Sequence, residues 1–279
     1  MSSVSASPAD ESEAAVTFET KCWEADWRFL LKRGGLERMI GSETFPFHTR
    51  SLYVNNVDSP REVLKAANRL VSRGILDRAE LVEEHANDAL DMANLGAGDL
   101  GRGYKYSIAE LVGLLLAETP YLVHFAGDCK ITDGAPWIAD GVTLLSETST
   151  VAVVSPRDSP VSTEFKRDVD QAADRWYFDS GFSDQCYLIR TGDFTAPIYG
   201  FSHPDSAMYP SYGGELFEKR VYSWLRCTDR HRAIYLGASY EHQRYGYLTA
   251  TQRAVRSVKF RAARRRSMAS SDTDSVGTG

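Results

Sequence analysis

The sequence lacks the long apolar run of a membrane-spanning protein. Its most apolar stretch, LVGLLLAETPYLVHF, is interrupted by Glu118 and Pro120, so it cannot cross a bilayer as one helix. The N-terminal segment MSSVSASPADESEAA lacks the basic and apolar regions of a signal peptide. From these two absences we expect a soluble, cytoplasmic protein.

Cysteine pairs and a positive charge balance are also missing. The four cysteines form no C-x-x-C pair, which argues against a zinc site or a disulfide framework. The formal net charge of −6 excludes a basic footprint spread over the whole protein, as a nucleic-acid-binding chain would have. We therefore expect reduced, buried thiols in an acidic protein, at Cys22, Cys129, Cys186 and Cys227.

The composition predicts one large domain between two tails. With 279 residues and 43% hydrophobic content, the chain is long enough to bury a sizeable core. Residues 1–14 are small, polar and acidic, which is typical of a disordered tail. Residues 15–250 form the expected domain, and 251–279 are expected to be a basic helix followed by a second disordered tail.

Strand-like and helix-like segments alternate along the domain, which predicts an α/β fold with a largely parallel central sheet flanked by helices. The helix at 59–74 has Ser59 as its N-cap, Pro60 at its first position and Gly74 after its end. Segment 79–85 fits a short strand or a helix equally well. We expect strands in 14–24, 50–57, 120–127, 150–156, 184–194 and 233–242, and helices in 26–40 (broken at Gly34 and Gly35), 59–74, 108–118, 135–147 and 216–231.

Polar side chains follow four of the predicted strands. In open α/β sheets ligands bind beyond the carboxyl ends of the strands, so these residues are candidates for one site. A hard divalent cation prefers carboxylate oxygens and tolerates imidazole, which favours Asp128 and His242 as ligands. Taken singly, each residue also has a simpler explanation, because Asp and Asn are common in turns. The candidates are Glu24, Asp26, Asn55, Asn56, Asp58, Asp128 and His242.

The order of these motifs resembles the GT-A-fold glycosyltransferases that use nucleotide sugars, most closely the large family-two group. The segment TKCWEADW offers Glu24 where that family meets the nucleotide base, and YVNNVDSP offers Asp58, with Asn56 beside it. The glycine-rich segment NLGAGDLGRGYKYS, which has no G-x-G-x-x-G or P-loop register, offers Arg102 and Lys105 as donor contacts. The resemblance implies a Rossmann-like GT-A fold, with a nucleotide-sugar-binding half (15–158) and an acceptor-binding half (159–250).

The same resemblance implies a divalent metal, Mn²⁺ or Mg²⁺, bound together with the nucleotide-sugar donor. The segment VHFAGD stands at the family's D-x-D strand, with Asp128 as the second acid and Ala126 in place of the first. Gly127 lies between them as a donor contact. The final strand ends at His242, where the family has a metal-binding histidine.

Catalysis is expected at the segment GELFEKRVYSWLR. It matches the family's acceptor-side E-D motif from Glu218 to Arg226, with Lys219 where the aspartate is usual. The resemblance implies an inverting reaction with Glu218 as the base and Glu215 as the second candidate. Lys219 and Arg220 are alternative phosphate contacts, while an exposed charged helix face would explain the same residues without catalysis.

The acceptor is less specified. Ser183, Asp184 and Gln185 lie at the start of the strand predicted in 184–194, where the resemblance implies the acceptor wall. The aromatic-rich 196–214 is a lid, an acceptor groove or a packed loop. His124 lies inside a strand, which favours a core role. A glycan, a small molecule or modified nucleic acid all remain open as the hydroxylated acceptor.

Two other functions remain open. The departures at Ala126 and Lys219 are compatible with a non-catalytic nucleotide-sugar or glycan-binding protein on a GT-A scaffold. The Arg-rich segment VKFRAARRR is a local exception in an acidic chain and is compatible with an anionic partner, including DNA whose modified bases would be glycosylated.

Overall fold

The computed structural model describes residues 14–132, 135–158, 175–209 and 214–243. Both expected tails, apart from residue 14, lie outside these ranges, as does the basic helix expected near the C-terminus. The described residues belong to one compact unit, Met1–Gln243.

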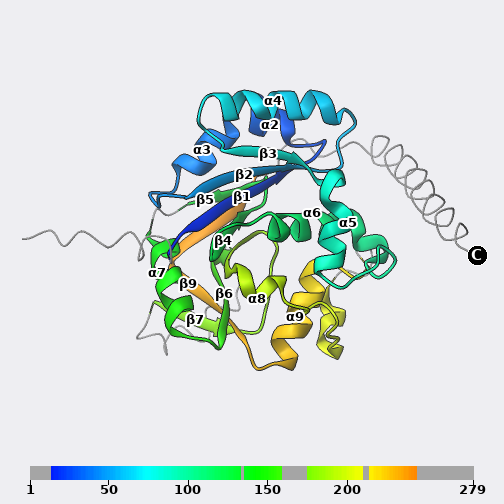
Figure 1. Cartoon of the computed structure of the whole chain (residues 1–279). Coiled ribbons are helices and arrows are strands. Elements are labelled where there is room, and N and C mark those ends of the chain that lie inside the picture. The colour runs from blue at the N-terminus through cyan, green and yellow to red at the C-terminus, as the bar shows by residue number, and fades with distance from the viewer. Residues whose placement is uncertain (1–13, 133–134, 159–174, 210–213, 244–279) are drawn as a thin grey trace, which may run out of the picture. The chain divides into compact units, whose positions relative to one another are not determined.

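Within the described ranges of this unit, nine strands form one sheet (Figure 1). Its strands are ordered β3-β2-β1-β4-β8-β6-β9-β5, and β7 pairs with β9 beside this path. The strands are β1 (Val16–Cys22), β2 (Thr49–Val54), β3 (Arg78–Leu81), β4 (Tyr121–Phe125), β5 (Cys129–Ile131), β6 (Val151–Asp158), β7 (Trp176–Asp179), β8 (Cys186–Arg190) and β9 (His231–His242).

The sheet has a parallel half and a mixed half. Strands β3, β2, β1 and β4 run parallel to one another, as expected from the alternation of strands and helices. Beyond β4, strand β8 is antiparallel to both β4 and β6, while β6 and β9 are parallel. Strands β5 and β7 are antiparallel to β9. The α/β prediction is confirmed, and the parallel arrangement dominates only the first half.

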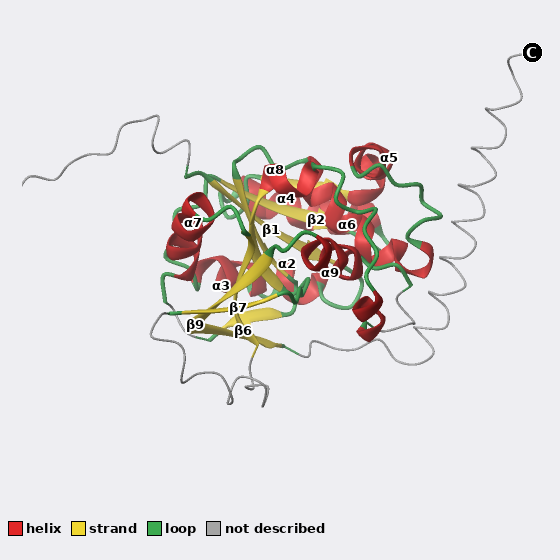
Figure 2. Ribbon diagram, turned by 90° about the horizontal axis from the view of Figure 1, so that it is seen from below, coloured by secondary structure: helices red, strands yellow, loops and turns green. Residues whose placement is uncertain are grey.

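Helices cover both faces of the sheet (Figures 1 and 2). One core contains residues of α2, α3, α4 and α7, and a second core contains residues of α5, α6, α8 and α9. The helices are α2 (Trp27–Lys32), α3 (Gly35–Gly41), α4 (Pro60–Ser72), α5 (Val82–Met92), α6 (Tyr104–Leu115), α7 (Trp137–Glu147), α8 (Thr191–Thr195) and α9 (Phe217–Cys227), with short 3₁₀ turns η1 (Gly101–Gly103) and η4 (Pro204–Met208).

The side-chain alternation of β1 explains how it contributes to two different layers. Val16 and Phe18 lie in the first core, as the period-two geometry of a strand requires. Glu19 and Lys21 belong to the other set of alternating positions, with the Glu19 carboxylate fully buried. A charged pair is thus built into the central strand, beneath α6.

Local signals located most helix ends. Gly34 takes a left-handed φ of +68° and separates α2 from α3, as expected for the Gly-Gly break. Ser59 and Pro60 begin α4, although the Ser59 side chain makes no capping hydrogen bond. Segment 79–85 contains both a strand and a helix, because β3 passes directly into α5 at Val82. Strands β5 and β7 have no counterpart among the sequence-based expectations. The strand expected in 184–194 is wrong at its end, because β8 stops at Arg190 and helix α8 begins at Thr191.

One cysteine prediction is wrong. Cys22, Cys129 and Cys186 are buried and unpaired, as expected, but Cys227 is exposed. It is the last residue of α9 and lies beyond the helix's buried stripe of Phe217, Val221, Trp224 and Leu225.

The described ranges contain the apolar stretch 111–125, which is divided between α6 and β4. Within them, the helices are too short or too polar to span a bilayer.

Candidate functional site

Polar segments from several elements meet at the carboxyl end of β4. Strands β1, β2 and β4 are parallel, so their carboxyl ends lie at one edge. Strand β8 is antiparallel to β4 and begins at that same edge, where the Ala126 N–H donates to the Gln185 carbonyl at 2.7 Å. The predicted metal motif and the predicted acceptor wall are therefore neighbours.

Asp128 and His242 lie together at this edge. The pairing of β5 with β9 places Cys129 opposite His242, and the Gln243 N–H donates to the Asp128 carbonyl at 2.7 Å. Asp128 Oδ2 is then 3.6 Å from His242 Nδ1. The neighbouring Asp128 carboxylate raises the pKa of His242. Both side chains are partly exposed, so a ligand can reach them.

Gly127 is needed for close packing. A Cβ at this position would lie 2.8 Å from both Asp26 Oδ2 and the Lys21 carbonyl oxygen. Asp26 is buried, accepts from the Trp23 N–H at 2.8 Å, and has its pKa raised to about 8 by that burial. Gly127 thus lets the turn between β4 and β5 approach the end of β1.

Glu24 joins the ends of β1 and β2. Its carboxylate accepts from the Asp58 N–H at 2.8 Å and from Arg28 Nη1 at 3.0 Å. Partial burial alone would raise the pKa of Glu24, but these two donors hold it below its usual value. Glu24 and Asp58, both predicted to contact the nucleotide sugar, are therefore in direct contact.

Asn56 and Lys105 are also brought together. Asn55 and Asn56 both donate through Nδ2 to the Lys105 carbonyl oxygen, at 3.1 Å and 2.6 Å. Asn56 adopts a left-handed φ of +50°, which Asn tolerates better than most residues. The Lys105 ammonium lies 4.6 Å from the ring centre of Tyr106. Arg102 is exposed in η1, and a Cβ at Gly214 would lie 3.1 Å from its backbone nitrogen.

The two predicted catalytic acids lie in different environments: Glu218 is in the first turn of α9, and Glu215 precedes that helix. Glu218 Oε1 accepts from the Asp184 N–H at 3.0 Å. Burial and the Asp184 charge raise the pKa of Glu218 to about 9. Glu215 instead forms an ion pair with Lys219 at 2.5 Å. Glu218, not Glu215, belongs to the edge at β4.

The Arg220 side chain hydrogen-bonds to backbone carbonyls. Its guanidinium donates to the carbonyls of Tyr199 and Asp99, at 2.5 Å and 2.6 Å. It therefore connects α9 to the glycine-rich segment and to the aromatic segment. The sequence suggested Arg220 as an alternative phosphate contact, but in the structure its guanidinium binds these two backbone carbonyls. Arg226 pairs with Asp205 at 3.2 Å, further along the helix.

A buried charged network lies under this edge, and sequence reasoning missed it. Lys21 Nζ contacts Glu19 Oε1, Glu110 Oε2 and His124 Nδ1 at 2.9, 2.7 and 3.0 Å. The Tyr187 hydroxyl donates to Glu110 at 2.6 Å. The expected core role of His124 is confirmed. The available signal was Glu110 within the otherwise apolar run IAELVGLLL, together with Glu19 and Lys21 two residues apart on a core strand.

The donor set of Glu19, Glu110 and His124 has the composition of a metal site, with all three donor atoms within 4.8 Å of one another. The Lys21 ammonium already contacts all three groups. A fixed cation therefore balances these carboxylates, and the network is a structural element.

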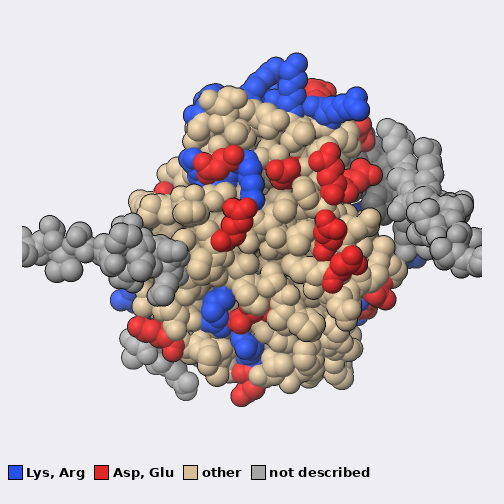
Figure 3. All heavy atoms as spheres, viewed as in Figure 1, with Lys and Arg blue, Asp and Glu red and all other residues tan. Residues whose placement is uncertain are grey.

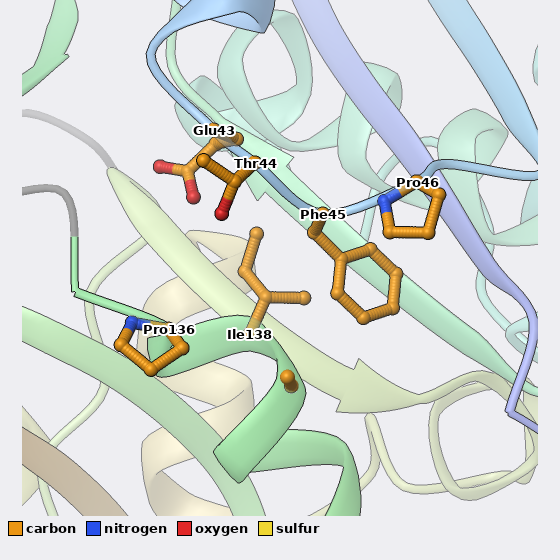
Figure 4. Close-up of a pocket in the computed structure, with 7 residues that line it drawn as sticks. Glu43, Thr44, Phe45, Pro46, Pro136 and Ile138 are labelled. Carbon is orange, nitrogen blue, oxygen red and sulfur yellow. The ribbon is translucent and has the colours of Figure 1, made fainter. Parts of the chain in front are cut away.

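Two other features lie apart from this edge. A cavity of about 230 Å³ lies between the segment after α3 and the start of α7, where Phe45, Pro46, Pro136 and Ile138 face one another and Glu43 lies at one side (Figure 4). Figure 3 shows Lys and Arg gathered over α4 and acidic residues toward α5. No predicted site residue lines the cavity.

Comparison with known proteins identifies the fold. No family model and no curated protein matches the chain. Among solved structures, GalNAc-T7 with UDP, GalNAc and Mn²⁺ is similar over 83% of this chain and 43% of its own, with a TM-score of 0.51 and 14% identity. The fold is of the GT-A type.

Two further structures align at lower scores. Residues 1–349 of TarS from S. aureus match over 82% of this chain and 60% of theirs, with a TM-score of 0.46 and 12% identity. Mouse xyloside xylosyltransferase 1 in its apo form matches over 76% and 82%, with a TM-score of 0.41 and 11% identity. The chain thus spans less than two thirds of GalNAc-T7 and of this part of TarS.

Proposed function

We propose that the protein is a glycosyltransferase that moves a sugar from a nucleotide-diphosphate sugar to a hydroxyl acceptor, with inversion and with help from a divalent metal. The observation that carries the proposal is the convergence of two pairs at the end of β4. Asp128 and His242 are one pair, and Asp184 and Glu218 are the other. The GT-A fold and the nucleotide-sugar enzymes that share it support the same reading.

The residues at this edge fit a divalent cation such as Mn²⁺ or Mg²⁺. One carboxylate and one imidazole, close together and partly exposed, are suitable oxygen and nitrogen ligands and leave positions for donor oxygens. In this proposal Asp128 and His242 hold the metal. When bound, the metal neutralises charge on the leaving diphosphate.

The donor is proposed to lie along the edge formed by β1, β2 and the start of α6. Glu24 and Asp58 are joined there, and Asn56 is bonded to the backbone of Lys105, so the segment is fixed before a ligand arrives. Arg102 and the Lys105 ammonium supply positive charge for phosphate oxygens. Gly127 keeps the turn beside Asp128 narrow.

The acceptor hydroxyl is proposed to lose its proton at the start of α9. Glu218 is the candidate because it lies at the β4 edge, whereas the Lys219 ion pair occupies Glu215. A positioned carboxyl group typically contributes about 10²- to 10⁴-fold to such a proton transfer.

The test is a turnover screen. Purified protein is incubated with UDP-, GDP- and dTDP-sugars, with and without Mn²⁺, and released nucleoside diphosphate is measured. We expect metal-dependent release with one donor class, lost in Asp128→Ala and kept in the surface variant Glu62→Ala. Release that persists in Asp128→Ala would contradict the proposed metal site, and binding without release from any donor would favour a non-catalytic nucleotide-sugar-binding protein.

A further inference from the structure

One face of α4 carries a row of cations. Arg61, Lys65 and Arg69 follow one another at intervals of four residues, so they share a helix face and rise by about 6 Å from one to the next. All three residues are exposed. The other side of the helix, with Val63 and Ala67, is buried in the first core. We call Arg61, Lys65 and Arg69 the α4 ridge.

Ion pairing distinguishes the ridge from the cations around it. Lys32 contacts Glu62 at 3.2 Å, and Arg73 contacts Glu37 at 3.1 Å. The three ridge residues form no ion pair within the part of the chain that the structure describes. Their positive charge is therefore not cancelled locally, although the chain as a whole has a formal net charge of −6.

The acidic side chains gather on a different helix. Figure 3 shows Lys and Arg over α4 and acidic residues toward α5, and both helices contact β3. The exposed acids of α5 are Glu83, Glu84, Asp88 and Asp91. Charge is thus separated on this side of the unit, so that an anionic partner is attracted to α4 and repelled at α5.

The shape and composition of the ridge select among anionic partners. Figure 1 shows α4 along the outer edge of the unit, where a flat surface can touch the ridge along its length. The helix has no aromatic side chain on which the bases of a single-stranded nucleic acid could stack. It exposes no large apolar side chain either, which favours contact with headgroups over insertion into a bilayer. Lipids diffuse laterally, so anionic headgroups can collect beneath a fixed row of cations.

We propose that the α4 ridge is a docking surface for the anionic headgroups of a lipid bilayer. A cation close to an anionic membrane typically strengthens binding by about fivefold. Salt limits the reach of this attraction to about 8 Å at physiological ionic strength, so the contact is reversible and salt-sensitive. The inference does not depend on the proposed transferase function, because docking on this surface requires neither donor nor acceptor.

The test is co-sedimentation of the full chain with lipid vesicles. One set of vesicles is phosphatidylcholine alone, and the other is an equimolar mixture of phosphatidylcholine and phosphatidylserine. We expect the protein to sediment with the mixed vesicles at low salt, to be released as salt rises, and to leave phosphatidylcholine vesicles unbound. The triple variant Arg61→Gln, Lys65→Gln, Arg69→Gln is expected to bind the mixed vesicles about 10- to 100-fold more weakly.

A second triple variant, matched in charge, is the control: Lys130→Gln, Arg175→Gln, Arg226→Gln. These exposed cations lie outside α4 and already have acidic partners. Exposed ion pairs contribute little, so this variant is expected to stay folded and to bind within about threefold of the wild type. The Arg-rich segment VKFRAARRR is the same in all three proteins, so the comparison isolates the ridge. Circular dichroism confirms that each variant is folded.

Four outcomes would overturn the proposal. Equal weakening of both triple variants would mean that only net charge matters. Unchanged binding in the ridge variant would mean that another segment carries the contact. Failure of the wild type to bind the mixed vesicles at low salt would exclude the surface altogether. Salt-sensitive binding of duplex DNA that depends on the ridge, without vesicle binding, would replace the bilayer with nucleic acid as the partner.

Discussion

The Asp128 carboxylate lies 3.6 Å from the His242 imidazole, although the two residues are far apart in the sequence. The short antiparallel pairing of β5 with β9 brings them together, because it sets Cys129 opposite His242.

Removing either member of this pair should weaken metal binding. Mutating a residue that only hydrogen-bonds to a metal ligand typically weakens metal binding by about 10- to 100-fold. Asp128→Ala and His242→Ala remove the proposed ligands themselves, so both variants are expected to bind Mn²⁺ at least about tenfold more weakly. Calorimetric titration of Mn²⁺ in the presence of a nucleoside diphosphate measures this. Asp229→Asn is the control, since that side chain is 99% exposed. Equal Mn²⁺ affinity in all four proteins would exclude this metal site.

Glu43 should make stability fall as pH rises. Burial raises the pKa of Glu43 from 4.5 to about 7 in the fold, with only a 3.5 Å contact from Trp137 Nε1 to offset it. The folded state therefore binds a proton that the unfolded chain releases near pH 4.5. The associated stability is complete below that pH and is lost as pH rises to about 7.

Glu43→Gln should remove this pH dependence. We expect the variant to be more stable than the wild type by about 1–3 kcal/mol at pH 8 and nearly equal to it at pH 4.5. Urea unfolding at both pH values measures the difference, and Glu62→Gln, on the exposed face of α4, is the matched control. If the stability of the wild type, Glu43→Gln and Glu62→Gln all rose by the same amount between pH 5 and pH 7, the assignment would be contradicted.

Lys21→Met should destabilise the domain severely. Burial alone would raise the pKa of Glu19, yet the Lys21 and His124 neighbours hold it below the usual value. Without the ammonium, two buried carboxylates lose their counter-charge, at a cost of about 3–5 kcal/mol. The cost should shrink at pH 5, where the carboxyl groups can protonate. Chemical unfolding at pH 5 and 7 tests this, with Lys65→Met on exposed α4 expected to change stability by less than about 0.5 kcal/mol.

Gly113→Ala should be harmful, against the ordinary helix preference. Alanine in a helix interior is normally better than glycine by about 1 kcal/mol. A Cβ at Gly113, however, would lie only 2.0 Å from the buried Glu19 Oε2. We therefore expect a net loss of about 1–3 kcal/mol in thermal or chemical unfolding.

Gly41→Ala is the matched control for that substitution, because a Cβ at this helical glycine meets nothing within 4 Å. It is expected to be neutral or slightly stabilising. If Gly113→Ala were as stable as Gly41→Ala, the Glu19 carboxylate would not pack against α6 in this way. Glu19→Ala combined with Gly113→Ala should show a coupling, since the clash disappears with the carboxylate.

Local patterns in the chain were sufficient to locate most elements. The strand expected in 14–24, the Ser59-Pro60 start of α4, the break at Gly34 and the helix expected in 216–231 each depend on residues a few positions apart, and the structure has β1, α4, the break and α9 there. Strands β5 and β7 were missed because β5 has three residues and β7 has four, and pairing with β9 supplies their stability.

The sequence by itself determined the α/β alternation, the polar residues at the strand ends and the order of motifs that resembles GT-A enzymes. Only the tertiary structure decided which of those residues meet. Strand register set Asp128 beside His242, and the packing of α9 on the β8 end set Glu218 against Asp184. The buried Lys21 network likewise joins four elements, β1, α6, β4 and β8. Such contacts depend on distances between segments far apart in the chain, and local periodicity carries no information about those distances.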